Sequence, residues 1–338
     1  MRISPKSSIR SVSKALCFLL PLLLLLCGVS LCLGASGMHI ADALKDVLHG
    51  RLTTPAARIL LYVRLPRVLC ALLAGAALSA SGVLIQAVLG NPLAGPNVIG
   101  VNAGAGFATL LLACAFPAAV QALPAAAFLG ALLASLFIFA LAERTGASRM
   151  TIVLSGVALS SILSAGMDLI TTLFPESTLG MSGFLIGGFS GVTTARLGSA
   201  ALYILPALVL ALLFSGELDV LQLGEEVAAS LGMRVRRTRF CLLLLSSVLA
   251  GAAVSFSGLL GFVGLIVPHA VRQFTGGEHR ILMPLSLVCG ALFVLACDTL
   301  GRTLFKPFEI PVGILMSFIG GPFFLFLLLR QRKGRVHD

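Results

Sequence analysis

The chain has 338 residues, of which 58% are hydrophobic and only 11% charged, and its mean hydropathy is +1.06. A water-soluble domain of this length does not require so apolar a composition, so a soluble globular protein is excluded. The formal net charge is +11. The basic residues lie mainly in short segments between apolar runs, which favours a membrane-flanking bias over nucleic-acid binding.

Apolar runs long enough to cross about 30 Å of hydrocarbon as helices recur along the whole sequence. Ten membrane spans are predicted, of which the eighth is short: 16–35, 67–89, 97–117, 122–142, 150–172, 198–215, 240–258, 259–274, 282–300 and 311–330. We therefore expect an all-α polytopic membrane protein with one transmembrane domain over residues 1–338. Small residues at helix-packing spacing, such as Gly251 and Ser255, predict a tightly packed bundle.

The distribution of lysine and arginine predicts the orientation of the chain. Ten spans place both termini on one side, and most basic residues fall on that side, so both termini are expected in the cytoplasm. The basic start and the apolar run that ends in Leu33-Gly34-Ala35 also resemble a signal peptide. Because the run is long for a signal core, we expect the first helix to be retained.

The eight cysteines show no Cys-x-x-Cys pair and lie in the predicted spans, so we interpret them as buried apolar residues. His269 and His279 stand ten residues apart with one nearby acid, which does not predict a metal site. Asp168 lies inside the fifth span, and an acid there is a functional candidate by default. The sequence shows no constellation typical of a membrane-bound enzyme.

The loop after the first span, residues 38–62, is moderately polar and is predicted to hold a short amphipathic surface helix. It ends in Arg64-Leu-Pro-Arg67, where Pro66 suits the first turn of the second span. The two arginines then lie at the outer mouth of that helix, either as interfacial anchors or as a contact for an anion or an acidic protein. The second span ends in Asn91-Pro-Leu-Ala-Gly-Pro-Asn97, which predicts a non-helical turn.

Residues 216–239 form the longest charge-dense interval of the chain, between two apolar spans. Residues 224–232 are predicted to form one short helix with acids in its first turn and Gly232 closing it in a left-handed conformation. Val227 and Leu231 give this helix a small apolar face. The interval is either a solvated loop with a positive flank or a binding element for a partner.

Several blocks of the sequence resemble the FecCD family, the permeases of type II ABC importers that carry iron-siderophore, haem and cobalamin. The resemblance begins with RLPR and LAGAALSASGVLIQAVLGNPLAGPN and covers nearly the whole chain. Further blocks follow in family order: LSGVALSSILSA (154–165), FLIGGFSG (184–191), LGEEVAASLG (223–232), FSGLLGFVGLIVPHAVR (256–272), GEHRILMPLS (277–286) and EIPVGILMSFIGGPFFLFLLLR (309–330).

The resemblance implies a permease subunit of a bacterial inner-membrane importer, with ten helices and the type II ABC importer permease fold. Its cargo would be a metal chelate, with an iron-siderophore ahead of haem or cobalamin, moved by alternating access. The implied partners are cytoplasmic ATPase subunits, a substrate-binding protein, membrane lipid and a second permease subunit, in a homodimer rather than a heterodimer. No nucleic acid is expected.

The sequence contains no Gly-x-x-x-x-Gly-Lys-Ser/Thr phosphate loop. The chain is therefore not expected to be an enzyme or to hold a cofactor or metal, and ATP and magnesium would bind the partner ATPase. The alternative class is a secondary transporter driven by an ion gradient. The scarcity of intramembrane acids and the lack of a clear inverted repeat speak against it.

The resemblance also implies roles for individual residues. Contacts with the ATPase are expected from a coupling helix and its flanks: Leu223, Gly224, Glu225, Glu226, Leu231 and Gly232. Docking of the binding protein is expected from exposed arginines at the outer mouth: Arg64, Arg67 and Arg302. The cytoplasmic gate is expected at two turns: Asn91 with Leu93, and Ala147 with Ser148. Two structural alternatives stay open, an Asp298–Arg302 contact and a capping role for Asn91.

Overall fold

The computed structural model describes residues 5–34, 39–144, 149–305 and 307–334, and these residues contain helices and no strand. Each of the ten predicted spans coincides with a helix. The corresponding helices are α1 Pro5–Cys32, α4 Leu65–Leu89, α5 Val101–Ala115, α6 Leu123–Arg144, α7 Arg149–Leu173, α10 Thr194–Leu213, α13 Val235–Ser257, α14 Val263–Thr275, α15 His279–Thr303 and α16 Val312–Gly334. The predicted all-α polytopic fold is confirmed.

Seven of the described helices are long and apolar enough to cross a membrane, and α5 and α16 contain shorter apolar segments. The eighth predicted span is the exception. Its helix α14 has 13 residues, which reach only about 20 Å at 1.5 Å per residue. This helix alone is therefore too short to cross the bundle. The chain reverses direction in the break between α13 and α14.

Short helices occupy the connections between the long ones. They are α2 Ile40–Leu48, α3 Pro55–Ile59, α8 Pro175–Leu179, α9 Ser182–Ile186, α11 Ser215–Gln222 and α12 Glu225–Ser230, and a π-helical turn, Leu60–Arg64, joins α3 to α4. The amphipathic helix predicted in the first loop is α2. The proline at position 66 lies in the first turn of α4, as predicted.

The helix α4 forms the centre of the bundle and packs against α13, α14 and α15. Its most apolar segment is 78% buried, whereas those of α1 and α7 are only 6% buried. Small side chains permit this central position: a Cβ atom on Gly75 would collide with the backbone carbonyl of Gly290 in α15. Close backbone approach at small residues is the usual basis of helix association in membranes.

A polar contact joins α4 to α13 in the apolar core. The hydroxyl groups of Ser81 and Ser246 lie 2.7 Å apart, and each also donates to the other residue's backbone carbonyl, at 2.9 and 3.1 Å. Both side chains are fully buried. Because each hydroxyl finds an acceptor, the pair avoids the cost of an unsatisfied polar group in a medium without water.

The break between α13 and α14 contains Phe262, the one described non-glycine residue with a positive φ, at 64°. Such a conformation is unusual for a bulky side chain. Its ring occupies the space that a side chain at position 320 of α16 would fill, because a Cβ atom on Gly320 would meet the Phe262 ring. The packing of α16 against this break therefore depends on a glycine in α16.

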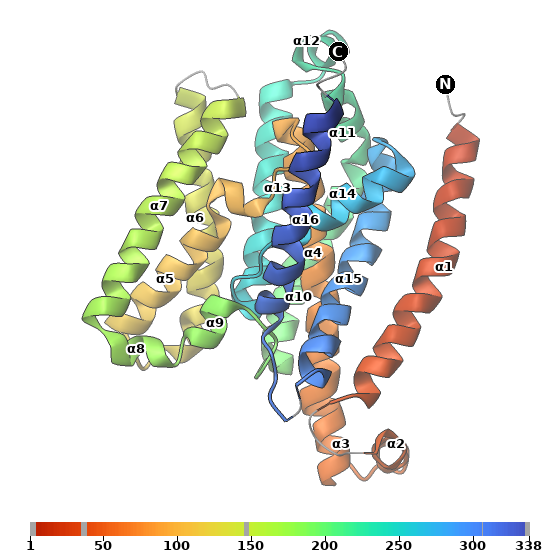
Figure 1. The fold of residues 1–338 in the computed structure, drawn as a ribbon, viewed down its shortest axis with the longest axis vertical. Helices are drawn as coiled ribbons and strands as arrows, with labels where there is room; N and C mark the ends of the chain where they lie inside the picture. The colour runs from red at the N-terminus through yellow and green to blue at the C-terminus, as the bar shows by residue number, and fades with distance from the viewer. Residues whose placement is uncertain (1–4, 35–38, 145–148, 306, 335–338) are drawn as a thin grey trace.

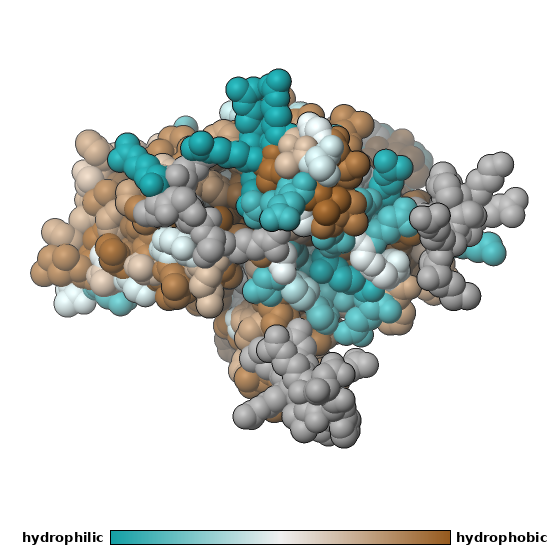
Figure 2. Space-filling view, turned by 90° about the horizontal axis from the view of Figure 1, so that it is seen from above, coloured by the Kyte–Doolittle hydropathy of each residue, from teal (hydrophilic) through white to brown (hydrophobic). Residues whose placement is uncertain are grey.

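The helices define two ends of the molecule (Figure 1). The beginning of α1, the end of α16 and the short helix α12 lie at one end, called here the α12 end, and α2, α3, α8 and α9 lie at the other, called the α2 end. Seen from the α12 end, hydrophilic side chains gather over the middle of the face, with apolar side chains at its margins (Figure 2). This pattern fits a water-exposed cap on a bundle whose flanks lie in hydrocarbon.

Candidate functional site

The α12 end carries the short helix predicted from the charge-dense interval. It begins after Gly224, whose φ of 101° and ψ of 158° suit glycine alone. It ends at Ser230, and Gly232 follows the C-cap residue with a φ of 86°. The Gly232 N–H donates to the Ala229 carbonyl at 2.9 Å and the Met233 N–H to the Ala228 carbonyl at 3.0 Å, a Schellman closure. The predicted left-handed closure at Gly232 is confirmed.

Three large apolar side chains on and beside α12 are exposed, and they are spaced four residues apart. Leu223 is 60% exposed, Val227 45% and Leu231 63%. The spacing places Val227 and Leu231 on one face of the helix. We call these three residues the α12 stripe. An apolar helical face at a water-exposed end, flanked by the exposed acids Glu225 and Glu226, has the form of a helix that fits a groove on another protein.

Contacts with neighbouring helices fix the position of the α12 stripe. Ala228 is fully buried, on the side of α12 that packs against α11 and α13. An ion pair joins Glu225 to Arg239 in α13, with 2.7 Å between the charged atoms. Two contacts from Asp219 in α11 tie this region to α15: its carboxylate accepts from the His279 N–H at 2.6 Å and lies 2.9 Å from Nδ1 of the His279 ring. Motion of α12 is thereby linked to α11, α13 and α15.

Gly232 offers a test of whether the shape of α12 matters. A Cβ atom at this position would meet nothing within 4 Å, so a substitution affects the backbone conformation alone. The left-handed conformation costs an L-residue roughly 1–2 kcal/mol, and asparagine tolerates it best. If α12 is the coupling helix that the family resemblance implies, Gly232→Ala should weaken association with the ATPase several-fold and Gly232→Asn should leave it near normal. Titration of purified ATPase onto the permease measures both; equal losses would contradict the left-handed requirement.

The α2 end carries a buried charge cluster formed by residues far apart in the sequence. Arg67 in α4 donates from Nε to both carboxylate oxygens of Asp298 in α15, at 3.0 and 3.2 Å. It also donates from Nη1 to Glu309 at 2.7 Å. Arg302 forms an ion pair with Asp298 at 3.0 Å, one helical turn away. The Asp298–Arg302 contact, one of the two alternatives left open by the sequence, is therefore present.

Arg302 and the neighbouring Arg64 also hold the end of α1. Arg302 donates to the Ser30 hydroxyl at 2.6 Å and to the Leu33 carbonyl at 3.2 Å. Arg64 donates to the carbonyls of Leu31 and Cys32, at 2.6 and 2.9 Å. The last carbonyls of a helix lack partners within the helix, and cations are favourable there. The cluster therefore joins α1, α4 and α15.

The expectation that Arg64, Arg67 and Arg302 are exposed is wrong. Their exposed fractions are 3%, 8% and 2%, respectively. Sequence reasoning placed them correctly at one mouth but could not show that Asp298 and Glu309 fold back onto them. Their role in docking a binding protein stays a prediction, because nothing in the chain alone tests it.

The turn predicted for one side of the gate follows α4 at the α12 end. Gly90 ends α4 in a left-handed conformation with a φ of 58°. The Asn91 side chain accepts a hydrogen bond from the Leu93 N–H at 2.9 Å, which accounts for Asn91 as a turn-forming residue. Ala147 and Ser148, the other predicted gate residues, lie outside the described residues. The gate assignment stays a prediction.

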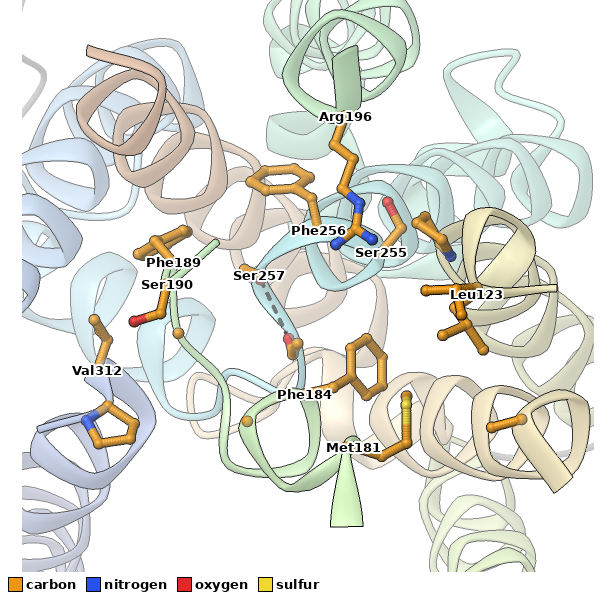
Figure 3. A pocket seen from close by; sticks show the side chains of 18 of the residues that line it. Leu123, Met181, Phe184, Phe189, Ser190, Arg196, Ser255, Phe256, Ser257 and Val312 are labelled. Carbon is orange, nitrogen blue, oxygen red and sulfur yellow. Dashed lines mark hydrogen bonds between the residues drawn. The ribbon is translucent and has the colours of Figure 1, made fainter. Parts of the chain in front are cut away.

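A cavity of about 570 Å³ lies near the α2 end, between the end of α5, the helices α8 and α9, and the break after α13. Figure 3 shows apolar side chains around it, among them Phe184, Phe189 and Phe256, with the Arg196 guanidinium directed into it beside Ser255. The short helices α8 and α9 form one wall of the cavity. The cavity is mainly apolar with a few polar groups, as is usual for sites that hold organic molecules.

Comparisons with known proteins decide the family. The model of the FecCD transport family matches residues 22–330. This chain belongs to the FecCD transport family. The hemin transport system permease protein HmuU of Yersinia pestis is 39% identical over 320 residues, which cover 92% of this chain and 96% of that protein. The Fe(3+) dicitrate transport system permease protein FecD of Escherichia coli is 39% identical over 277 residues, 81% of this chain and 86% of that one.

A solved structure supports the family assignment. It is described as an inward-facing conformation of a putative metal-chelate type ABC transporter. It matches with a TM-score of 0.83 at 30% identity and covers 94% of this chain and 99% of that one. A second structure, PsaBC from Streptococcus pneumoniae, has a TM-score of 0.58 at 18% identity and indicates the fold alone.

Membership in the FecCD family settles the class of protein. The chain is a multi-pass permease subunit of an ABC importer of the inner membrane, and ATP hydrolysis belongs to a separate ATPase chain. Its partners are the ATPase, a binding protein and a second permease subunit. The alternative of an ion-gradient-driven secondary transporter is wrong.

Proposed function

We propose that this permease subunit moves a ferric chelate into the cytoplasm by alternating access, with α12 as its coupling helix. The observation that carries the coupling assignment is the exposed α12 stripe at an end rich in hydrophilic side chains (Figure 2). An ATPase groove that buries Leu223, Val227 and Leu231 would remove three large apolar side chains from water. Glu225 and Glu226 would add polar contacts at the rim, and Gly224 and Gly232 set the bounds of the helix.

The proposed cargo is a ferric siderophore, ahead of haem, which is another iron complex, and of cobalamin, which is a cobalt complex. Support comes from the relatives, whose names specify hemin, Fe(3+)-citrate and a siderophore. Hemin and Fe(3+)-citrate are iron complexes, and siderophores are chelators that bind ferric iron. The chain itself is proposed to hold no cofactor, while ATP and magnesium bind the ATPase.

We propose a homodimer in which both termini are cytoplasmic. This orientation places α12 and the turn at Asn91 and Leu93 on the side of the ATPase, and the predicted partner segment at Ala147 and Ser148 completes the gate. It places the buried charge cluster on the outer side. A binding protein's carboxylate would then compete with Glu309 for Arg67, because Glu309 is the more exposed of the two acids that hold this arginine.

Uptake into proteoliposomes that contain this chain and its ATPase tests the proposed function. We expect uptake of radioactive ferric siderophore that requires both ATP and a cargo-loaded binding protein. Haem and cobalamin, each offered on its own binding protein, serve as the comparison cargoes. Uptake of cobalamin alone would overturn the iron assignment, and uptake without ATP under an ion gradient would overturn the coupling mechanism.

A further inference from the structure

A groove of about 860 Å³ lies on the flank of the bundle between α6, α10 and α13. Its floor consists of small buried residues, Ala200 and Ala252, whose short side chains leave the space open. The residues that form its walls are larger and apolar. Leu129 and Tyr203 are more than half exposed, and the Phe128 ring stacks on the Tyr203 ring with 5.6 Å between the ring centroids. The groove is thus a depression in the largely apolar flank of helices that are long and apolar enough to cross a membrane.

Arg196 stands at the mouth of this groove, in the first turn of α10 at the α2 end. It lines both the groove and the neighbouring 570 Å³ cavity, into which its guanidinium points beside Ser255 (Figure 3). In the part of the chain that the structure describes, this guanidinium has no hydrogen bond or ion pair. Glu176, an acid that lines the same cavity, does not pair with it. Among the described residues, the Arg196 guanidinium thus has no direct anionic partner.

An apolar groove with a cation at one end matches an amphipathic molecule with an anionic head. A carboxylate of a docked protein would satisfy Arg196 but would leave the groove empty. An iron chelate would enter the inner cavity but has no reason to extend along an outward-facing apolar groove. We propose that an anionic phospholipid occupies this place, with its phosphate on Arg196 and an acyl chain against Phe128, Leu129 and Tyr203.

The headgroup must supply the selectivity of such a site. An acyl chain exchanges one apolar environment for another when it leaves the bilayer for the groove. Its binding in the groove therefore contributes little free energy. The guanidinium, in contrast, donates two parallel hydrogen bonds to a phosphate oxygen pair and favours net negative charge. The attraction of one arginine to an anionic surface is about 1 kcal/mol, which corresponds to about a fivefold preference. This inference does not depend on the identity of the cargo.

The chain contains no tryptophan, so one introduced indole reports on its surroundings without background. The full-length Leu129→Trp chain is reconstituted in phosphatidylcholine vesicles that contain either brominated phosphatidylglycerol or brominated phosphatidylcholine. Bromine quenches indole fluorescence on contact. We expect about fivefold stronger quenching per molecule by the brominated phosphatidylglycerol. A Leu205→Trp chain, with its indole further along α10 and outside the groove, is expected to show no preference.

The charge is tested by adding Arg196→Gln to the Leu129→Trp chain. The preference for phosphatidylglycerol should disappear with this change, whereas Arg51→Gln, a change of an exposed arginine in the first loop, should leave it intact. Equal quenching by both lipids with Arg196 present would overturn the proposal, as would a preference that survives Arg196→Gln. A change in Leu129→Trp emission on addition of ferric citrate in pure phosphatidylcholine would assign the site to anionic cargo instead.

Discussion

Association of the permease with its ATPase falls by at least about tenfold when Val227 and Leu231 are both replaced by aspartate. Full burial of one exposed large apolar side chain contributes about 1.5–3 kcal/mol, the two side chains are 45% and 63% exposed, and each 1.4 kcal/mol is a factor of ten. The two charges also add a desolvation cost at the interface. ATP-dependent uptake should be abolished. Titration of the ATPase onto permease in lipid nanodiscs measures the association directly.

The matched control is a second pair of exposed apolar residues four positions apart on a short helix. Leu44 and Leu48 of α2 are 52% and 76% exposed, and they lie at the opposite end of the molecule (Figure 1). Aspartates at these two positions should leave ATPase association unchanged. The thermal unfolding of both variants should stay close to that of the parent chain, because the altered side chains are exposed. Normal ATPase association of the α12 variant would refute the coupling role.

The membrane-spanning elements were predictable because hydrocarbon imposes a simple rule. Every backbone polar group must be satisfied within a segment, so an apolar run becomes a helix whatever its neighbours are. The limits of α12 were predictable for a different reason, since Gly224 and Gly232 adopt conformations that other residues avoid. Both predictions depend on local chemistry, which a sequence displays directly.

The partners of the charged residues were not predictable in the same way. Arg67 lies 231 residues from Asp298 and 242 from Glu309, and only the folded bundle brings them together. The pairing of His279 with Asp219, 60 residues away, has the same origin. An arginine near a membrane interface is expected to be exposed. The acids that pair with these buried arginines are brought to them only by the arrangement of the helices.

The break between α13 and α14 shows a further limit. The apolar pattern runs without interruption from the seventh predicted span into the eighth, and nothing in it indicates that Phe262 adopts a positive φ. That conformation is imposed by packing, because the ring fills the space beside Gly320 in α16. Glycine at position 320 is the signal that could have pointed to a close contact there, although not to its partner.

Asp298→Asn is expected to destabilise the chain by about 3–5 kcal/mol, the usual cost of removing one partner from a buried ion pair. Asp298 is fully buried and is the acid shared by Arg67 and Arg302, so its loss leaves both guanidinium groups with less compensation. The expected drop in unfolding temperature is roughly 10 °C. Thermal unfolding of the detergent-purified protein measures it. Asp168→Asn, which alters an exposed acid of α7, should leave the temperature unchanged.

Two further variants test whether the charge cluster stabilises the fold or leaves its arginines available to bind a docking protein. Glu309→Gln should cost less than Asp298→Asn, because the Glu309 side chain is 32% exposed and water can replace it on Arg67. The double change Asp298→Asn with Arg302→Gln should be more stable than Asp298→Asn alone, since it removes the cation that the first change leaves unpaired. If Asp298→Asn unfolds at the parent temperature instead, the cluster does not stabilise the bundle, and Arg67 and Arg302 remain available to the carboxylates of a binding protein.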